Sequence, residues 1–147
     1  MKAKPTGYGF TVDTAPIAKA RARVVTKGGV TRAYTPQKTA TFEQLVGIRA
    51  REAMRGQPPL DGALYIMIQC YLPRPKAHYG KAGIKPQFVN AEPIGRPDLD
   101  NYCKAVLDGI NGVVFKDDSQ VISQTSHKFY VNGLDDPARV EVEVKTL

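Results

Sequence analysis

An acidic helix that leads through a turn into a strand, within residues 96–121, is the feature that most constrains the fold of this chain. Its sequence, RPDLDNYCKAVLDGINGVVFKDDSQV, places apolar side chains at helical spacing over residues 99–111, and Asn111-Gly112 is a typical helix end. Residues 119–131 are rich in β-branched and aromatic side chains, which predicts a strand. Such a unit needs further strands to complete a sheet beneath the helix.

Other segments have the patterns of those strands. Residues 63–72 are nearly all apolar, which predicts a central strand buried on both faces. Val140, Val142 and Val144 alternate with charged residues, which predicts a strand with one face in water. A short first strand is expected over residues 9–14, before Pro16.

A hairpin and a second helix are predicted in the first third of the chain. Residues 21–26 and 30–34 flank a Lys-Gly-Gly turn, which is typical of a hairpin. Thr41 and Gln44 have the spacing of a capping box, which predicts a helix from there to Gly56. The elements together predict an α+β fold in two layers, with a mixed, mostly antiparallel sheet and two main helices on one face.

A long loop separates two of the predicted strands. Residues 73–97 contain five prolines and three glycines, with four basic residues before Arg96. Within a compact domain, an irregular excursion of this length is usually functional or mobile. Because the strands on either side need each other to form a core, we expect residues 1–147 to form one domain.

Charge is distributed unevenly along the chain, whose net charge is +7. Residues 1–55 contain eleven Lys and Arg against three acids, whereas residues 98–147 contain five against nine. The basic first part predicts a polyanionic partner, although basic surface can also serve solubility alone.

The two cysteines and the hydropathy pattern indicate the compartment. Cys70 and Cys103 lack the close spacing of a zinc site and the density of a disulfide scaffold, which favours a reduced, cytoplasmic protein. The first ten residues have no apolar stretch of a signal peptide. Residues 63–72, the longest apolar stretch, are too short to cross a bilayer, so we expect no membrane partner.

Carboxylates gather in the acidic segment in a way that suits a metal ion. Asp98 and Asp100 lie at the start of the predicted helix, and Asp117 and Asp118 lie at the turn before the strand. Magnesium takes oxygen ligands at roughly 2.1 Å and keeps several waters, so carboxylates from two elements can hold it beside a phosphate. Lys104 would bring positive charge to that phosphate.

Each of these residues also has a simpler explanation. An Asp at a helix start can cap the helix, and an Asp-Asp pair is common in turns. Lys104 can form an ion pair with Asp100 or Asp108, one helical turn away, and Asp108 is left outside the predicted site. A non-catalytic module that binds branched DNA and a small metal-dependent phosphatase therefore remain alternatives to a nuclease.

The acidic segment nevertheless resembles a known signature. DLDN at residues 98–101, Lys104, Asp108-Gly109 and KDDSQV at residues 116–121 resemble the motif of RusA-type Holliday-junction resolvases, including prophage-encoded members. Upstream, PIAKARAR at residues 16–23 is similar to the family's PxPKGRPR strand, with alanines in place of some prolines and glycines. YTPQKT at residues 34–39 resembles the family's lead into its first helix.

The resemblance implies a Mg²⁺-dependent endodeoxyribonuclease, with Mn²⁺ as a possible substitute, that acts in DNA recombination and repair. It implies that Asp98, Asp100 and Asp118 are the metal ligands, that Asp117 is a possible auxiliary ligand and that Lys104 is the active-site lysine. No organic cofactor is implied.

The resemblance further implies a homodimer that resolves four-way or branched DNA by paired symmetric cuts, in the cytoplasm of a bacterial or phage-infected cell. Basic side chains before and within the first helix are the candidates for phosphate contacts. These are Arg21, Arg23, Lys27, Arg32 and Lys38.

Overall fold

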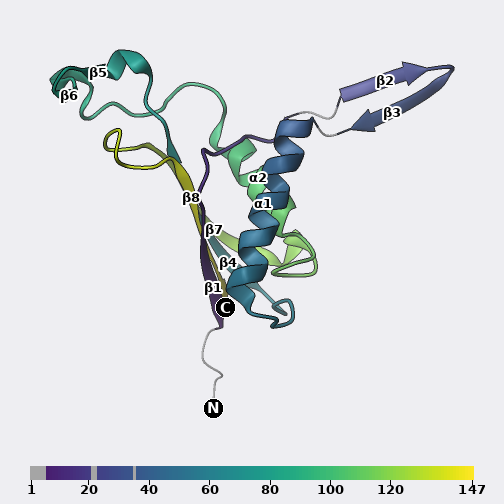
Figure 1. The fold of residues 1–147 in the computed structure, drawn as a ribbon. Coiled ribbons are helices and arrows are strands. Elements are labelled where there is room, and N and C mark those ends of the chain that lie inside the picture. The colour runs from purple at the N-terminus through teal and green to yellow at the C-terminus, as the bar shows by residue number, and fades with distance from the viewer. Residues whose placement is uncertain (1–5, 21–22, 35) are drawn as a thin grey trace.

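A four-stranded sheet and two helices form the body of the protein (Figure 1). The computed structural model describes residues 6–20, 23–34 and 36–147. The sheet has the order β1-β8-β4-β7, in which β8 is antiparallel to β1 and β4, and β7 is parallel to β4. Its strands are β1 (Gly7–Val12), β4 (Leu64–Leu72), β7 (Val121–Tyr130) and β8 (Arg139–Thr146).

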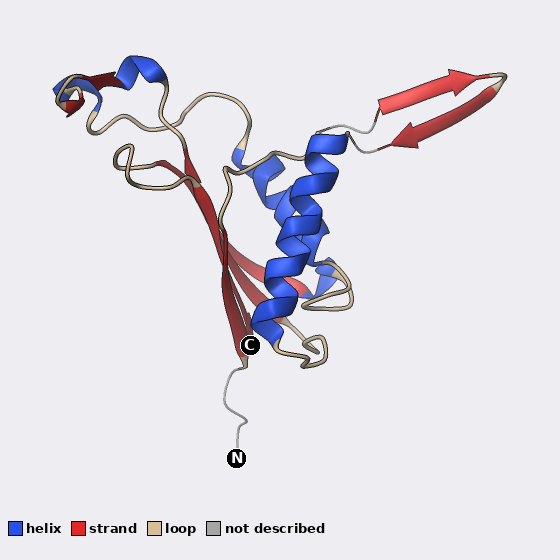
Figure 2. Cartoon of the chain, in the orientation of Figure 1, coloured by secondary structure: helices blue, strands red, loops and turns tan. Residues whose placement is uncertain are grey.

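The helices α1 (Gln37–Met54) and α2 (Leu99–Ile110) cover the same face of this sheet, as Figure 2 shows. The predicted α+β fold, with a mixed, mostly antiparallel sheet and two helices on one face, is therefore confirmed. Apolar side chains from both layers fill the space between them. Among the most deeply buried are Ile66 and Val144 of the sheet and Val46, Val106 and Ile110 of the helices.

The expectation that residues 63–72 are buried on both faces is wrong for one face. Leu64, Ile66, Ile68 and Cys70 face the helices and are fully buried. The side chains that alternate with them are only half-buried, because no described helix covers the second face. An apolar run indicates a central strand but does not show how many layers cover it.

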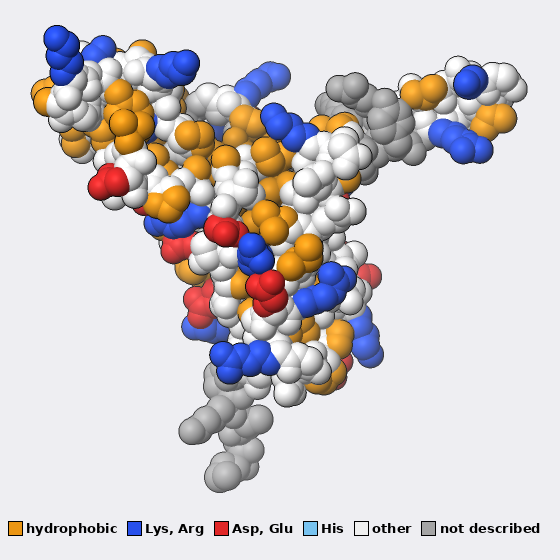
Figure 3. Space-filling view, in the orientation of Figure 1, with side chains coloured by type: hydrophobic (Ala, Val, Ile, Leu, Met, Phe, Trp, Pro, Cys, Tyr) orange, Lys and Arg blue, Asp and Glu red, His pale blue; other side chains and the backbone are white. Residues whose placement is uncertain are grey.

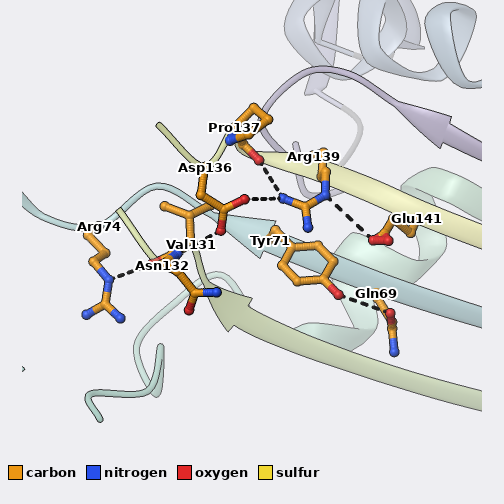
Figure 4. A network of polar contacts seen from close by, with 9 residues as sticks. All are labelled: Gln69, Tyr71, Arg74, Val131, Asn132, Asp136, Pro137, Arg139 and Glu141. Atoms are coloured by element: carbon orange, nitrogen blue, oxygen red, sulfur yellow. Dashed lines mark hydrogen bonds and ion pairs between the residues drawn. The ribbon is translucent and has the colours of Figure 1, made fainter. Parts of the chain in front are cut away.

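A polar network covers part of that second face near the ends of the strands (Figure 4). The guanidinium of Arg139 lies 3.9 Å from the ring centroid of Tyr71 and 2.8 Å from Oδ1 of Asp136. Nearby, Nε of Arg74 donates a hydrogen bond of 2.6 Å to the carbonyl of Val131. The Arg74 bond ties the start of the 73–97 excursion to the residue that follows β7.

The first long helix begins earlier than the capping box predicted. Pro36 occupies the N-cap position of α1, and no side chain caps the helix there. Thr41 and Gln44 lie inside the helix, so they do not form its start. The hydroxyl of Thr39 donates a long hydrogen bond of 3.4 Å to the carbonyl of Ala18, a tertiary contact that no local pattern reveals.

Two projections leave the body at the end where both helices begin (Figure 1). One is the predicted hairpin of β2 (Arg23–Lys27) and β3 (Val30–Tyr34). It turns at Gly28 and Gly29, whose φ angles of +58° and +78° favour glycine.

The other projection is the 73–97 excursion, which is more regular than the sequence predicted. It contains the 3₁₀ helices η1 (Lys76–His78) and η2 (Pro86–Phe88) and the short strands β5 (Tyr79–Gly80) and β6 (Gly83–Ile84). The rings of His78 and Phe88 stack with centroids 4.4 Å apart, so the projection has internal packing of its own.

Close contact between the helices depends on a glycine of α2. A Cβ atom at Gly109 would lie 2.9 Å from the carbonyl oxygen of Glu43 and 2.9 Å from Cβ of Val46. Gly109→Ala is therefore expected to lower the free energy of unfolding by about 1–3 kcal/mol, measured by denaturant unfolding. Gly95→Ala is the control, because nothing lies within 4 Å of its added Cβ. Equal losses in the two variants would contradict this close packing.

Candidate active site

Two unpaired carboxylates stand at the start of α2. Asp98 is the N-cap residue, but its side chain makes no capping hydrogen bond, and Asp100 is exposed in the first turn. Neither takes part in the ion pairs found among the described residues. Capping therefore does not account for the Asp98 side chain, and both carboxylates are available to a cation.

The backbone that leads into Asp98 is held by a lysine from the sheet. Nζ of Lys128, on β7, donates hydrogen bonds of 2.8 Å to the carbonyl of Gly95 and 3.1 Å to that of Pro97. Sequence reasoning missed this residue, since a single lysine in a strand has no local signal of such a role. Lys128 ties the end of the long excursion to the sheet and so sets the place where α2 begins.

Hydrogen bonds within the turn before β7 position Asp118. The 3₁₀ helix η3 (Asp118–Gln120) is capped by Asp117, whose Oδ1 accepts a hydrogen bond of 3.1 Å from the N–H of Ser119. This bond to the backbone lowers the pKa of Asp117. The side chain of Gln120 accepts from the N–H groups of Lys116 and Asp117 and donates to two carbonyls before β4. One oxygen of Asp117 is thus engaged in the cap.

Lys104 is the point at which the two acidic segments meet. Its Nζ lies 3.1 Å from Oδ1 of Asp108 and 3.6 Å from Oδ2 of Asp118. The hydrogen bond that Lys104 donates to Asp108 raises the pKa of Lys104, and the charge of Asp118 adds to this despite the opposing effect of burial. The ammonium therefore stays charged at neutral pH, and the partner one helical turn away is Asp108 and not Asp100.

The carboxylates are not gathered into a cage. In the parts of the chain that the structure describes, no three His, Cys, Asp or Glu side chains lie close enough to hold a metal ion. Asp118 lies beside the Lys104–Asp108 stretch of α2, and Asp108 is two turns, or roughly 12 Å of helix axis, beyond Asp100. The structure thus brings Asp118 to Lys104 without bringing three acids together.

Asp98 and Asp100 still provide the kind of oxygen donor that magnesium prefers. Mg²⁺ is a hard ion that is usually bound by one or two carboxylates, with waters and substrate phosphates in its other positions. Asp98 and Asp100 supply oxygen donors on the exposed start of a helix, where an incoming phosphate has access.

The predicted phosphate contacts lie mainly on the hairpin. Lys27 and Arg32 are exposed, and the pairing of Val25 with Arg32 places both basic residues on one face of the two-stranded ribbon. Lys38 is exposed at the start of α1. Arg23 begins β2, but its side chain is not among those described.

Arg21, also a predicted phosphate contact, lies outside the described residues. The second projection carries basic side chains that sequence reasoning did not select. Lys76 and Lys81 are exposed there, and Figure 3 shows Lys and Arg side chains on both projections. The density of basic residues in 73–97 was the signal that could have identified them.

Comparison with known proteins shows the family of the chain. A family model described as Endodeoxyribonuclease RusA matches residues 13–145. "Uncharacterized protein YqaN" of Bacillus subtilis (strain 168) is 33% identical over 138 residues, which are 92% of this chain and 94% of that protein. The fold and the match define an endodeoxyribonuclease. The chain belongs to the RusA endodeoxyribonuclease family.

Among the helices that the structure describes, none has both the length and the apolar character needed to cross a bilayer.

Proposed function

We propose that this protein is a Mg²⁺-dependent, structure-specific endodeoxyribonuclease that resolves Holliday junctions by paired symmetric cleavage in DNA recombination and repair. Family membership gives the class of reaction. The observation that carries the proposal is the contact between Lys104 of α2 and Asp118 of η3, because it joins two acidic segments that are separate in the sequence.

In this proposal Asp98, Asp100 and Asp118 hold the divalent ion, with Asp117 as an auxiliary ligand and Mn²⁺ as a substitute for Mg²⁺. A divalent ion held by these residues would supply Lewis-acid chemistry at the phosphodiester and would favour ionisation of a bound water. Lys104 keeps its charge and is half exposed, so its ammonium can approach the phosphate oxygens on which negative charge develops.

The two projections are the proposed DNA-binding surfaces. A two-stranded β ribbon fits the major groove of B-DNA, and Lys27 and Arg32 on one face of the hairpin would contact phosphates there. Arg21, Arg23 and Lys38 are the other proposed phosphate contacts, and Lys38 is exposed at the start of α1. Lys76 and Lys81 would contact a second arm of the junction.

We further propose that residues 1–147 act as one domain in a homodimer, in the cytoplasm of a bacterial or phage-infected cell. Paired symmetric cuts require two sites, and a two-fold dimer presents its two copies of one site to a two-fold substrate. A prophage origin follows the resemblance to prophage-encoded members of the family. No organic cofactor is needed for this chemistry.

A cleavage assay on a labelled synthetic four-way junction, beside a linear duplex of the same sequence, tests the proposal. With Mg²⁺ or Mn²⁺ the junction should receive symmetric paired nicks and the duplex should stay intact, and EDTA should stop all cleavage. Binding without any nicks would instead support the non-catalytic branched-DNA-binding module. Hydrolysis of a free phosphomonoester without junction cleavage would support a phosphatase.

A further inference from the structure

An ion-pair network extends from Lys104 through Asp108 and Lys19 to Glu43. The proposed reaction does not use the last three of these residues. We propose that Asp108 is a positioning residue: Lys19 and Glu43 hold it, and it sets the place of the Lys104 ammonium beside Asp118. This inference rests on the proposed function, since it concerns how the active-site lysine is held.

Asp108 provides the short contact of the Lys104 side chain. The distance from Nζ of Lys104 to Asp108 is 3.1 Å, within hydrogen-bond range, whereas the distance to Asp118 is 3.6 Å, which is too long for a hydrogen bond. The Lys104 side chain is 53% exposed, so water and its own flexible stem compete with any single position. The contact with Asp108 therefore selects the position in which the ammonium faces Asp118.

Asp108 uses both of its oxygens for this purpose. Oδ1 pairs with Lys104, and Oδ2 lies 3.1 Å from Nζ of Lys19. The same Nζ donates a hydrogen bond of 2.7 Å to Oε1 of Glu43 on α1. Glu43 therefore places a second negative charge beside the ammonium of Lys19. The side chains of Lys19, Glu43 and Asp108 are 20–25% exposed, far less than that of Lys104.

Tertiary contacts fix the less exposed part of this ion-pair network, which consists of Lys19, Glu43 and Asp108. The backbone N–H of Lys19 donates a hydrogen bond of 2.8 Å to the carbonyl of Asn101, in the first turn of α2. Gly109 lets α1 approach α2 closely enough that Glu43 and Asp108 share one lysine. Burial opposes the charge of Lys19, but the bonds to Glu43 and Asp108 outweigh it and raise the pKa of Lys19. An ion pair on the solvated surface would have neither the backbone hydrogen bond of Lys19 nor the close helix contact at Gly109.

The test compares Asp108→Asn with wild type in single-turnover cleavage of a four-way junction. An amide nitrogen cannot accept a hydrogen bond, so one of the two lysines loses its partner. The cleavage rate at saturating protein is expected to fall about 10–100-fold, the usual cost of losing a group that orients an active-site residue. The Kd for the junction should stay unchanged, and Asp108→Glu, which keeps two charged oxygens, should restore most of the rate.

Asp136→Asn is the matched control. The Asp136 side chain is 23% exposed, close to the 22% of Asp108, and it pairs with Arg139 at 2.8 Å in a different part of the molecule. This control should cleave at the wild-type rate. Denaturant unfolding of both variants shows whether a loss of cleavage rate comes from a displaced Lys104 side chain or from a loss of folding stability.

A double-mutant cycle decides whether Asp108 acts through Lys104. In a Lys104→Met background, Asp108→Asn should cause no further loss of rate. The inference is overturned if Asp108→Asn cleaves at the wild-type rate, or if its loss is equally large without Lys104. Nitrogen-15 NMR of the lysine ammonium groups gives an independent readout: the Lys104 signal should shift in Asp108→Asn. Wild-type protein that cuts no junction would contradict the proposed function, whereas an unshifted Lys104 signal would contradict this inference alone.

Discussion

Asp98→Asn is expected to abolish junction cleavage while the affinity for the junction stays the same or increases. The variant removes a charge that we propose binds the divalent ion, and a metal ion contributes several kcal/mol of transition-state stabilisation, so the rate should fall about a thousandfold or more. Binding is preserved because one fewer negative charge faces the phosphates. Cleavage and gel-shift assays on the same labelled junction measure both effects.

Asp135→Asn is the control for the change in net charge. Asp135 is exposed in the turn between β7 and β8, outside the acidic segment, and its variant should cleave normally. The fold of Asp98→Asn should be intact, because the Asp98 side chain makes no capping hydrogen bond. Normal cleavage by Asp98→Asn would remove Asp98 from the site.

Lys104→Met should have the second-largest effect. It retains a long apolar stem but removes the ammonium that lies near Asp118. Loss of a group that stabilises developing negative charge typically lowers kcat about 10²–10³-fold, and we expect a loss of this size in single-turnover cleavage. The loss should persist at saturating Mg²⁺, because added metal does not replace the ammonium that the variant lacks.

Lys145→Met is the matched control for this variant. Lys145 is 51% exposed, against 53% for Lys104, and it pairs with Glu143 at 2.8 Å on the opposite face of the sheet. It should cleave like wild type. If Lys104→Met lost no more activity than Lys145→Met, Lys104 would be an ordinary surface lysine.

Local patterns were sufficient to predict much of the fold. The apolar stripe of α2, the glycine turn of the hairpin and the valine alternation of β8 each depend on neighbours in the sequence, and all three elements form. The start of α1 was not predictable in this way, because Thr39 contacts Ala18 across the hairpin. The uncovered face of β4 was missed for a similar reason, since layer number depends on where the helices dock.

The candidate site was predictable only in part. The two acidic segments were identifiable from their composition, but their meeting through Lys104 depends on a loop that folds back along α2 and buries Phe115. Lys19 and Lys128 were missed because their partners are distant in the sequence and their contacts involve tertiary packing. Asp108 had a visible signal, its four-residue spacing from Lys104, yet that spacing alone also fits a solvated pair.

The most direct test is the position of Mn²⁺ in crystals of the protein bound to a four-way junction, located by anomalous scattering. The account predicts a manganese peak within coordination distance, roughly 2.2 Å, of oxygens from Asp118 and from at least one of Asp98 and Asp100. An ion held without Asp118, or bound away from the start of α2, would contradict the claim that the two acidic segments form one site.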